Sequence, residues 1–86
     1  MLSDSILTVV IRNKDRVLYN GQAFAVSTVN EKGPLDILAE HESFISLIKN
    51  KVIVRMTPKE NMEFQIENGI VKVYKDNVHV YVNFKA

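Results

Sequence analysis

The sequence predicts an all-β fold, a small β-sandwich of two antiparallel sheets built from about eight to ten short strands. Apolar and polar residues alternate with a period of two along most of the chain, which is typical of half-buried strands. Turn-forming residues interrupt these segments at short intervals. The chain has 86 residues, of which 47% are apolar, and this is enough for one core. We therefore expect a single domain over residues 1–86.

The first strand is expected close to the N-terminus. Leu7, Val9 and Ile11 would share one face of this strand. Thr8 and Arg12 would lie on the opposite face. The alternation predicts a strand that buries one side against the core.

Three further strands are predicted in the middle of the chain. Residues 17–19 form a short strand that ends at Asn20-Gly21, because this pair favours a turn. Residues 22–29 continue as a longer strand. Residues 52–57 alternate again and predict another strand.

The last third has the clearest pattern. Alternating residues 62–67 are followed by Asn68-Gly69, a strong two-residue hairpin signal because both positions tolerate positive φ. Residues 70–75 are expected to form the returning strand, and Asp76-Asn77 a second tight turn. Residues 78–84 alternate again and predict the last strand, which ends at Phe84. The sequence therefore predicts a three-stranded antiparallel meander with one apolar face.

One segment, from Leu35 to Asn50, is ambiguous from its residues alone. Pro34 suits the first turn of a helix. One helical stripe would consist of Leu35, Leu38, Ile45 and Ile48. The same residues also fit two short strands around a polar break at His41.

Composition excludes several classes of function. The 11 Lys and Arg residues nearly balance the 10 Asp and Glu residues, so nothing indicates a surface for nucleic acid or for an anionic membrane. The sequence has no cysteine, which excludes disulfides, thiol catalysis and Cys-based metal sites. The apolar run at residues 6–11 is too short for a signal peptide, and no segment is long enough to span a membrane. We therefore expect no direct membrane insertion.

Chemically active residues gather in one place only. Asp36, Glu40, His41 and Glu42 have the right side chains for a metal site or for acid–base chemistry, but their spacing matches no ligand motif. Ser43 and Ser46 lie nearby, without the glycine-flanked elbow of a serine nucleophile. We therefore expect a solvated loop, with no catalytic residue, metal or cofactor.

Surplus apolar residues point to a binding surface. Ile6, Val10 and Val29 exceed what a one-sided strand pattern requires, and such surplus on a small domain often marks an interface. Tyr74 and Tyr81 could alternatively line a groove for a peptide or a carbohydrate.

Several segments, in this order and spacing, carry a resemblance to a known family. They are LTVVIR, VLYNGQAFAVSTVNEKG, GPLDILAEH, FISLI and FQIENGIVKVYKDNVHVYV. Together they run from about Leu7 to Phe84 and resemble the N-terminal β-sandwich domain of the epsilon subunit of the F-type ATP synthase. The resemblance implies that the segment from Leu35 to Asn50 forms two strands around a loop at His41.

The resemblance also implies a function. In this family the sandwich is a non-catalytic part of the central stalk, which binds the gamma subunit and touches the c-ring, so that ion-driven rotation is coupled to ATP synthesis. By this resemblance the c-ring side would consist of residues at one end of the sandwich, namely Glu31, Lys32, Pro34 and His41. The gamma side would consist of Phe44, Ile45 and Leu47. We expect no cofactor or small-molecule ligand, and a peripheral location on the cytoplasmic face of the membrane, through the complex.

The sequence departs from the family pattern in three places. Ala39-Glu40 and Glu42-Ser43 stand where the family usually has prolines around the histidine, and Asn50-Lys51 replaces a frequent Pro-Gly. Family members usually continue into a C-terminal helical hairpin, whereas this sequence stops at Ala86, either as an excised domain or as a naturally short version, so we assign none of the hairpin's regulatory roles here. Two alternatives stay open: a binding module for peptide or carbohydrate with no role in ATP synthesis, and a small metal-dependent enzyme.

Overall fold

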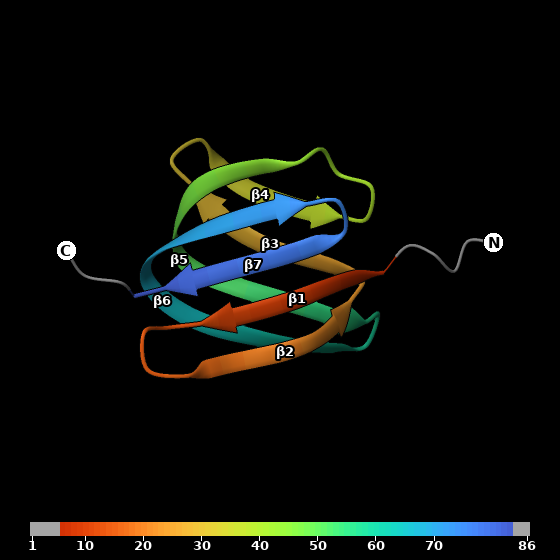
Figure 1. The fold of residues 1–86 in the computed structure, drawn as a ribbon, viewed down its shortest axis with the longest axis horizontal. Coiled ribbons are helices and arrows are strands. Elements are labelled where there is room, and N and C mark those ends of the chain that lie inside the picture. The colour runs from red at the N-terminus through yellow and green to blue at the C-terminus, as the bar shows by residue number, and fades with distance from the viewer. Residues whose placement is uncertain (1–5, 84–86) are drawn as a thin grey trace.

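A computed structural model describes residues 6–83, which form seven strands and, within this range, no helix (Figure 1). The predicted all-β class is confirmed. The strands are β1 (Leu7–Arg12), β2 (Val17–Ala23), β3 (Ala25–Asn30), β4 (Gly33–Leu38), β5 (Phe44–Thr57), β6 (Glu60–Tyr74) and β7 (Asn77–Val82).

The strands form one continuous sheet that folds over itself into the two layers of a sandwich (Figure 1). Its strand order is β2-β1-β7-β6-β5-β3-β4. In one layer, residues 44–48 of β5 pair with residues 69–73 of β6, and this part of β6 also pairs with β7. In the other layer, residues 50–57 of β5 pair with residues 60–66 of β6, and this part of β5 also pairs with β3. Because these two long strands run through both layers, the described residues contain seven strands and not the eight to ten shorter ones expected.

One strand pair differs from the antiparallel arrangement that the sequence predicted. β1 lies parallel to β7, with Val9 opposite Val78 and Ile11 opposite Val80, so the sheet is mixed. A parallel pair joins distant parts of the chain without a tight turn, and for this reason the local sequence carries no signal for it.

The core lies between the two layers. Leu7, Val9 and Ile11 are completely buried and Thr8 and Arg12 are exposed, as the alternation in β1 predicted. Burying a side chain of this size stabilises the fold by about 1.5–3 kcal/mol. The same inward alternation holds in β5, β6 and β7, where the buried residues include Val52, Val54, Val71, Val73, Val78, Val80 and Val82.

The predicted hairpin at Asn68-Gly69 is wrong. β6 runs through this pair without a turn, and neither residue has a positive φ. Instead β5 and β6 bend side by side here, where the register of their pairing shifts between Ile48 and Asn50. Asn50 takes up the bend with a φ of 73°.

Contacts with the end of β7 explain why Asn68-Gly69 stays in a strand and does not form a turn. Asn83 accepts a hydrogen bond from the Glu67 N–H at its side-chain oxygen (2.9 Å), and its own N–H donates to the Asn68 carbonyl (2.7 Å). A Cβ atom on Gly69 would lie 2.9 Å from the carbonyl oxygen of Tyr81. Gly69 therefore serves close backbone approach between strands and not a hairpin turn.

The remaining turn predictions have mixed outcomes. β2 continues through Asn20-Gly21 and ends at Ala23, so the predicted turn at that pair is wrong. The turn before β7 lies at residues 75–76, one residue earlier than predicted. The segment from Leu35 to Asn50 is strand, loop and strand, as the family resemblance implied, with the loop at residues 39–43. The expected position of Phe84 lies outside the described residues.

The close approach at Gly69 yields a prediction. Gly69→Ala places a methyl group against the Tyr81 carbonyl and 3.2 Å from Ile48 Cγ1, and we expect it to lower the free energy of unfolding by about 1–3 kcal/mol. Urea denaturation measures the loss. Gly21→Ala is the matched control, because the added methyl meets only the far end of the Tyr19 side chain. Equal losses in the two variants contradict the account of the bend.

Candidate functional site

The residues expected to face the c-ring lie at two different ends of the molecule. Glu31 and Lys32 form the turn between β3 and β4, and Pro34 is the second residue of β4. His41 follows the opposite end of β4, beyond the pair formed by Leu38 and Ala25. A strand of this length spans about 20 Å. The expectation that His41 lies on the same end as Glu31 and Lys32 is therefore wrong.

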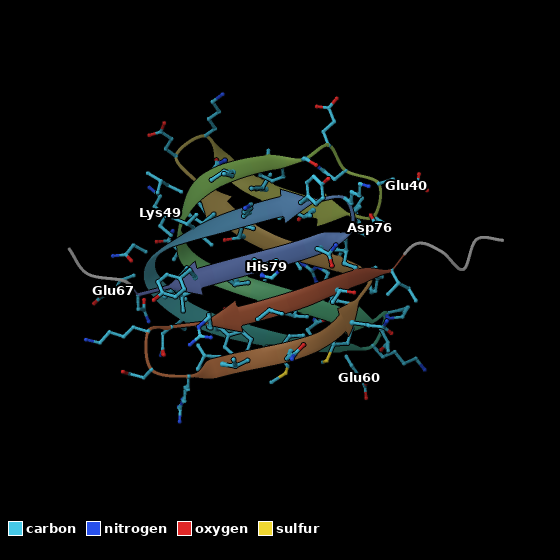
Figure 2. All side chains as sticks on the ribbon, in the orientation of Figure 1. Glu40, Lys49, Glu60, Glu67, Asp76 and His79 are labelled. Atoms are coloured by element: carbon cyan, nitrogen blue, oxygen red, sulfur yellow. The ribbon has the colours of Figure 1, made fainter. Side chains whose placement is uncertain are left out.

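Figure 2 shows the same separation. Glu40, the neighbour of His41, lies on the right beside Asp76. Lys49, which pairs with Val29 just before the Glu31–Lys32 turn, lies on the left. The turn of residues 31–32 and the loop of residues 39–43 therefore present separate surfaces.

The turn of residues 31–32 is held in shape by Asn30. Its side-chain oxygen accepts the Lys32 N–H (2.9 Å), and its amide nitrogen donates to Ser46 Oγ on β5 (3.3 Å). Asn30, Glu31, Lys32, Ser46 and Leu47 surround a hollow of about 280 Å³. The structure thus brings two predicted c-ring residues next to Leu47, which the sequence placed on the gamma side.

His41 is built into the loop that contains it. Its Nδ1 lies 2.9 Å from the Glu42 carbonyl oxygen, and its ring packs against Phe44 with the ring centroids 4.9 Å apart. Its backbone N–H donates to the Leu38 carbonyl (3.2 Å). The imidazole therefore helps to shape the start of β5.

The loop is also fixed to the turn between β6 and β7. Glu40, with a φ of 66°, donates its N–H to Asp76 Oδ1 (2.8 Å). Ser43 Oγ accepts the Lys75 N–H at 3.3 Å. These two contacts tie together segments that are more than 30 residues apart in the sequence.

The three residues expected on the gamma side do not share a face. Ile45 and Leu47 are each 68% exposed and point out of the sandwich. Phe44 is half-buried and packs against the core, because successive residues of a strand point to opposite sides. The exposed pair can contact a partner, and Phe44 supports the strand from beneath.

The candidate metal cluster does not assemble. Among residues 6–83, no group of three or more His, Asp or Glu side chains lies close enough together to hold a metal ion. Ser43 Oγ accepts the Lys75 N–H, and Ser46 Oγ accepts from the Asn30 amide and donates to the Leu47 carbonyl. These contacts pair neither serine hydroxyl with an imidazole. Within the same range, the fold has no helix suited to crossing a bilayer.

Two further hollows lie on the outer side of β6 and β7. Tyr74 lines one of them with Lys72, Asn77 and His79, and Tyr81 lines the other. The two tyrosines lie on the same face, in two adjoining hollows. Lys72 and His79 line both hollows, and Arg12 lines the second one. The sequence carries no signal for this grouping, because only the pairing register of β1, β6 and β7 brings these residues together.

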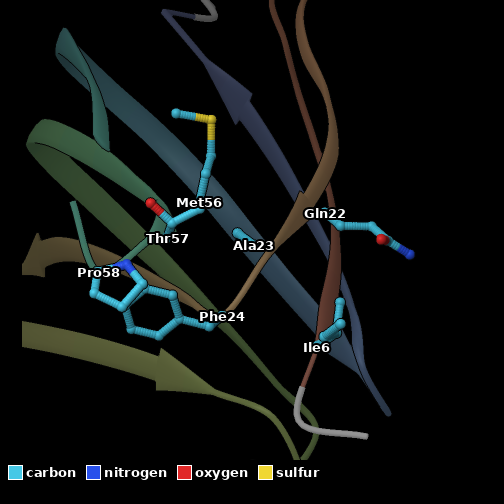
Figure 3. Close-up of a pocket in the computed structure, with 7 residues that line it drawn as sticks. All are labelled: Ile6, Gln22, Ala23, Phe24, Met56, Thr57 and Pro58. Carbon is cyan, nitrogen blue, oxygen red and sulfur yellow. The ribbon is translucent and has the colours of Figure 1, made fainter. Parts of the chain in front are cut away.

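An apolar hollow of about 460 Å³ opens where the end of β2 meets the turn after β5 (Figure 3). In Figure 3, Ile6 lies across it from Phe24 and Pro58. Ile6 is 45% exposed, in line with its surplus apolar character in the sequence. The lining of this hollow includes no acidic, basic or histidine side chain, so the hollow offers no group for acid–base chemistry.

Comparison with known families gives a direct match. Residues 6–84 match the family described as ATP synthase, Delta/Epsilon chain, beta-sandwich domain. The chain belongs to this family. The resemblance inferred from the sequence is therefore confirmed.

Curated relatives agree with the assignment to the delta/epsilon family. The chain is 35% identical over 79 residues to the ATP synthase epsilon chain of Sulfurimonas denitrificans, which covers 91% of this chain and 61% of the relative. It is 26% identical over 80 residues to the ATP synthase epsilon chain of Corynebacterium efficiens, covering 91% of this chain and 64% of that relative. The chain thus spans less than two thirds of the length of these relatives.

Solved structures show the same fold. One chain of the Euglena gracilis mitochondrial ATP synthase, in a structure of OSCP, F1 and c-ring, superposes with a TM-score of 0.81 at 15% identity and covers 88% of this chain and 49% of its own. A chain from the central stalk and c-ring structure of the Tetrahymena thermophila mitochondrial ATP synthase gives 0.75 at 13% identity, covering 91% and 63%. The family's sandwich fold is thus the one observed here.

The contact between Glu40 and Asp76 yields a prediction about the loop of residues 39–43. Asp76→Ala removes the acceptor of the Glu40 N–H, and we expect it to lower the free energy of unfolding by about 1 kcal/mol. Hydrogen exchange at the Glu40 amide should accelerate in parallel. Asp76→Asn keeps a side-chain oxygen and should retain most of the protection. Unchanged exchange in Asp76→Ala contradicts the role of this contact.

Proposed function

We propose that this chain is a non-catalytic subunit of the central stalk of a rotary ATP synthase. In this role it binds the gamma subunit and contacts the c-ring, so that ion-driven rotation is coupled to ATP synthesis. The observation that carries the proposal is the family match over residues 6–84, together with 35% identity over 91% of the chain to a curated epsilon chain. The complex would hold the chain at the cytoplasmic face of the membrane as a peripheral subunit.

The fold suits a part that transmits force. The strands β5 and β6 run through both layers and join them. One layer therefore cannot slide over the other without breaking strand pairing. Such a sheet moves as one body, and a coupling element between a rotating ring and a stalk requires this rigidity.

The gamma side is proposed at the exposed pair Ile45 and Leu47 on β5. Exposed aliphatic side chains are costly to leave in water, and their burial favours a lasting complex. The c-ring side is proposed at the turn of Glu31 and Lys32, with Pro34 beside it. Both side chains of the turn are exposed and charged, which suits the polar rim of an interface.

The gamma side can be tested by substitution. Leu47→Glu puts a charge on the proposed contact, and we expect it to weaken binding to the cognate gamma subunit by about 30-fold, or about 2 kcal/mol. Leu38→Glu is the control, because Leu38 is 53% exposed but lies on β4 in the other layer. Titration calorimetry with each variant measures the affinities. Equal weakening by the two substitutions rules out the assigned side.

The c-ring side can be tested by cross-linking, because the chain has no cysteine of its own. Single variants Glu31→Cys, Lys32→Cys and His41→Cys are each assembled into the synthase, together with a cysteine in the polar loop of the ring subunit. We expect disulfide cross-links to the ring from positions 31 and 32 and none from position 41, at the other end of β4. Cross-linking from position 41 alone reverses the proposed orientation.

A further inference from the structure

The outer face over β5, β6, β7 and β1 is continuous across four paired strands. One row of outward residues runs through Leu47, Ile70, Tyr81 and Arg12, each directly opposite the next on neighbouring strands. With a strand spacing of about 4.8 Å, this row is about 14 Å wide, which is enough to seat a helix. The exposed Leu47 of the proposed gamma side is therefore the margin of a larger surface.

A second row lies beside the first. It runs through Ile45, Lys72, His79 and Val10 in the same cross-strand register. Ile45 is 68% exposed, and Val10 is one of the residues that the sequence marked as surplus apolar. The two rows thus combine five apolar or aromatic side chains with Arg12, Lys72 and His79, which lie on β1, β6 and β7.

The two rows carry no carboxylate. Their charged residues, Arg12 and Lys72, are both positive, although the whole chain has nearly equal numbers of basic and acidic residues. Asp76 lies in the turn before β7, Glu67 lies on β6 at the bend, and Asp36 and Glu63 lie on the strands of the other layer. The strand register therefore concentrates positive charge on one apolar face.

Six of these side chains surround a hollow of about 240 Å³ above β7. They are Val10, Arg12, Ile70, Lys72, His79 and Tyr81. Valine, isoleucine and tyrosine supply apolar walls, and the two cations lie on β1 and β6, the strands on either side of β7. A hollow of this composition fits a side chain with an aliphatic stem and a negative end, such as glutamate.

We propose that this face receives an acidic, amphipathic segment of the stalk partner, with a carboxylate seated between Arg12 and Lys72. The inference rests on the proposed function and adds the chemistry of the contact. Tyrosine and arginine are among the residue types enriched at the positions that carry most of the binding energy of interfaces. An anionic membrane is the weaker alternative, because such surfaces usually present about four to eight clustered basic residues and this face has two.

The test reverses the two charges with the full chain. Arg12→Glu with Lys72→Glu should weaken binding to the cognate gamma subunit by about 100-fold and reduce its salt dependence. The matched control, Lys51→Glu with Lys59→Glu, changes the net charge equally at exposed positions outside the face, and it should stay within about twofold of wild type. Circular dichroism and urea denaturation verify that both variants fold.

The outcomes separate the two proposals. If the wild-type chain does not bind the gamma subunit, the proposed function fails and this inference fails with it. If the wild type binds and the two double variants behave alike, the stalk role stands and the inference is overturned. If Arg12→Glu with Lys72→Glu spares gamma binding but abolishes binding to phosphatidylglycerol vesicles, the face belongs to a lipid surface and the inference is likewise overturned.

Discussion

The paired bend of β5 and β6 is the constraint on which the rest of the structure depends. Asn50 turns the first strand with a positive φ, and Gly69 lets the second pass close to the Tyr81 carbonyl. Without this bend the long strands would continue as one flat ribbon, and the apolar faces of β1 and β3 would have no opposite layer to pack against. The same bend places the first half of β5 beside β6 and β7, so that Ile45 and Leu47 join the outer face of those strands.

Much of the fold was predictable because strand alternation is a local property. The buried positions of β1 and β7 and the break at His41 follow from residues that are close in the sequence. The pair Asn68-Gly69 was misleading, because its turn preference is overridden by pairing with β5 and by the hydrogen bonds of Asn83. The parallel pairing of β1 with β7 depends on contacts between the two ends of the chain, which no local pattern encodes.

The candidate surfaces were predictable only in part, for a similar reason. A strand pattern tells which residues point outward, and Val10, which exceeded the one-sided pattern of β1, is only half-buried. It does not tell which strands are neighbours, so it could not place Arg12 and Lys72 around one hollow. The expected strand before His41 is present as β4, and its length places His41 and Glu31 at opposite ends, contrary to the expectation that they share one end. The proposed function therefore rests on the family match, and the proposed positions of the binding surfaces rest on the strand register.

The most direct test of the central claim is a methyl NMR titration of the full chain with the cognate gamma subunit. The claim is that one outer face, over β5, β6, β7 and β1, binds the stalk. The account predicts that the methyl signals of Ile45, Leu47 and Ile70 shift or broaden on binding, while those of Leu38 and Ile53 on the other layer stay in place. Perturbation of Leu38 and Ile53 with unchanged signals from Ile45 and Leu47 would contradict it.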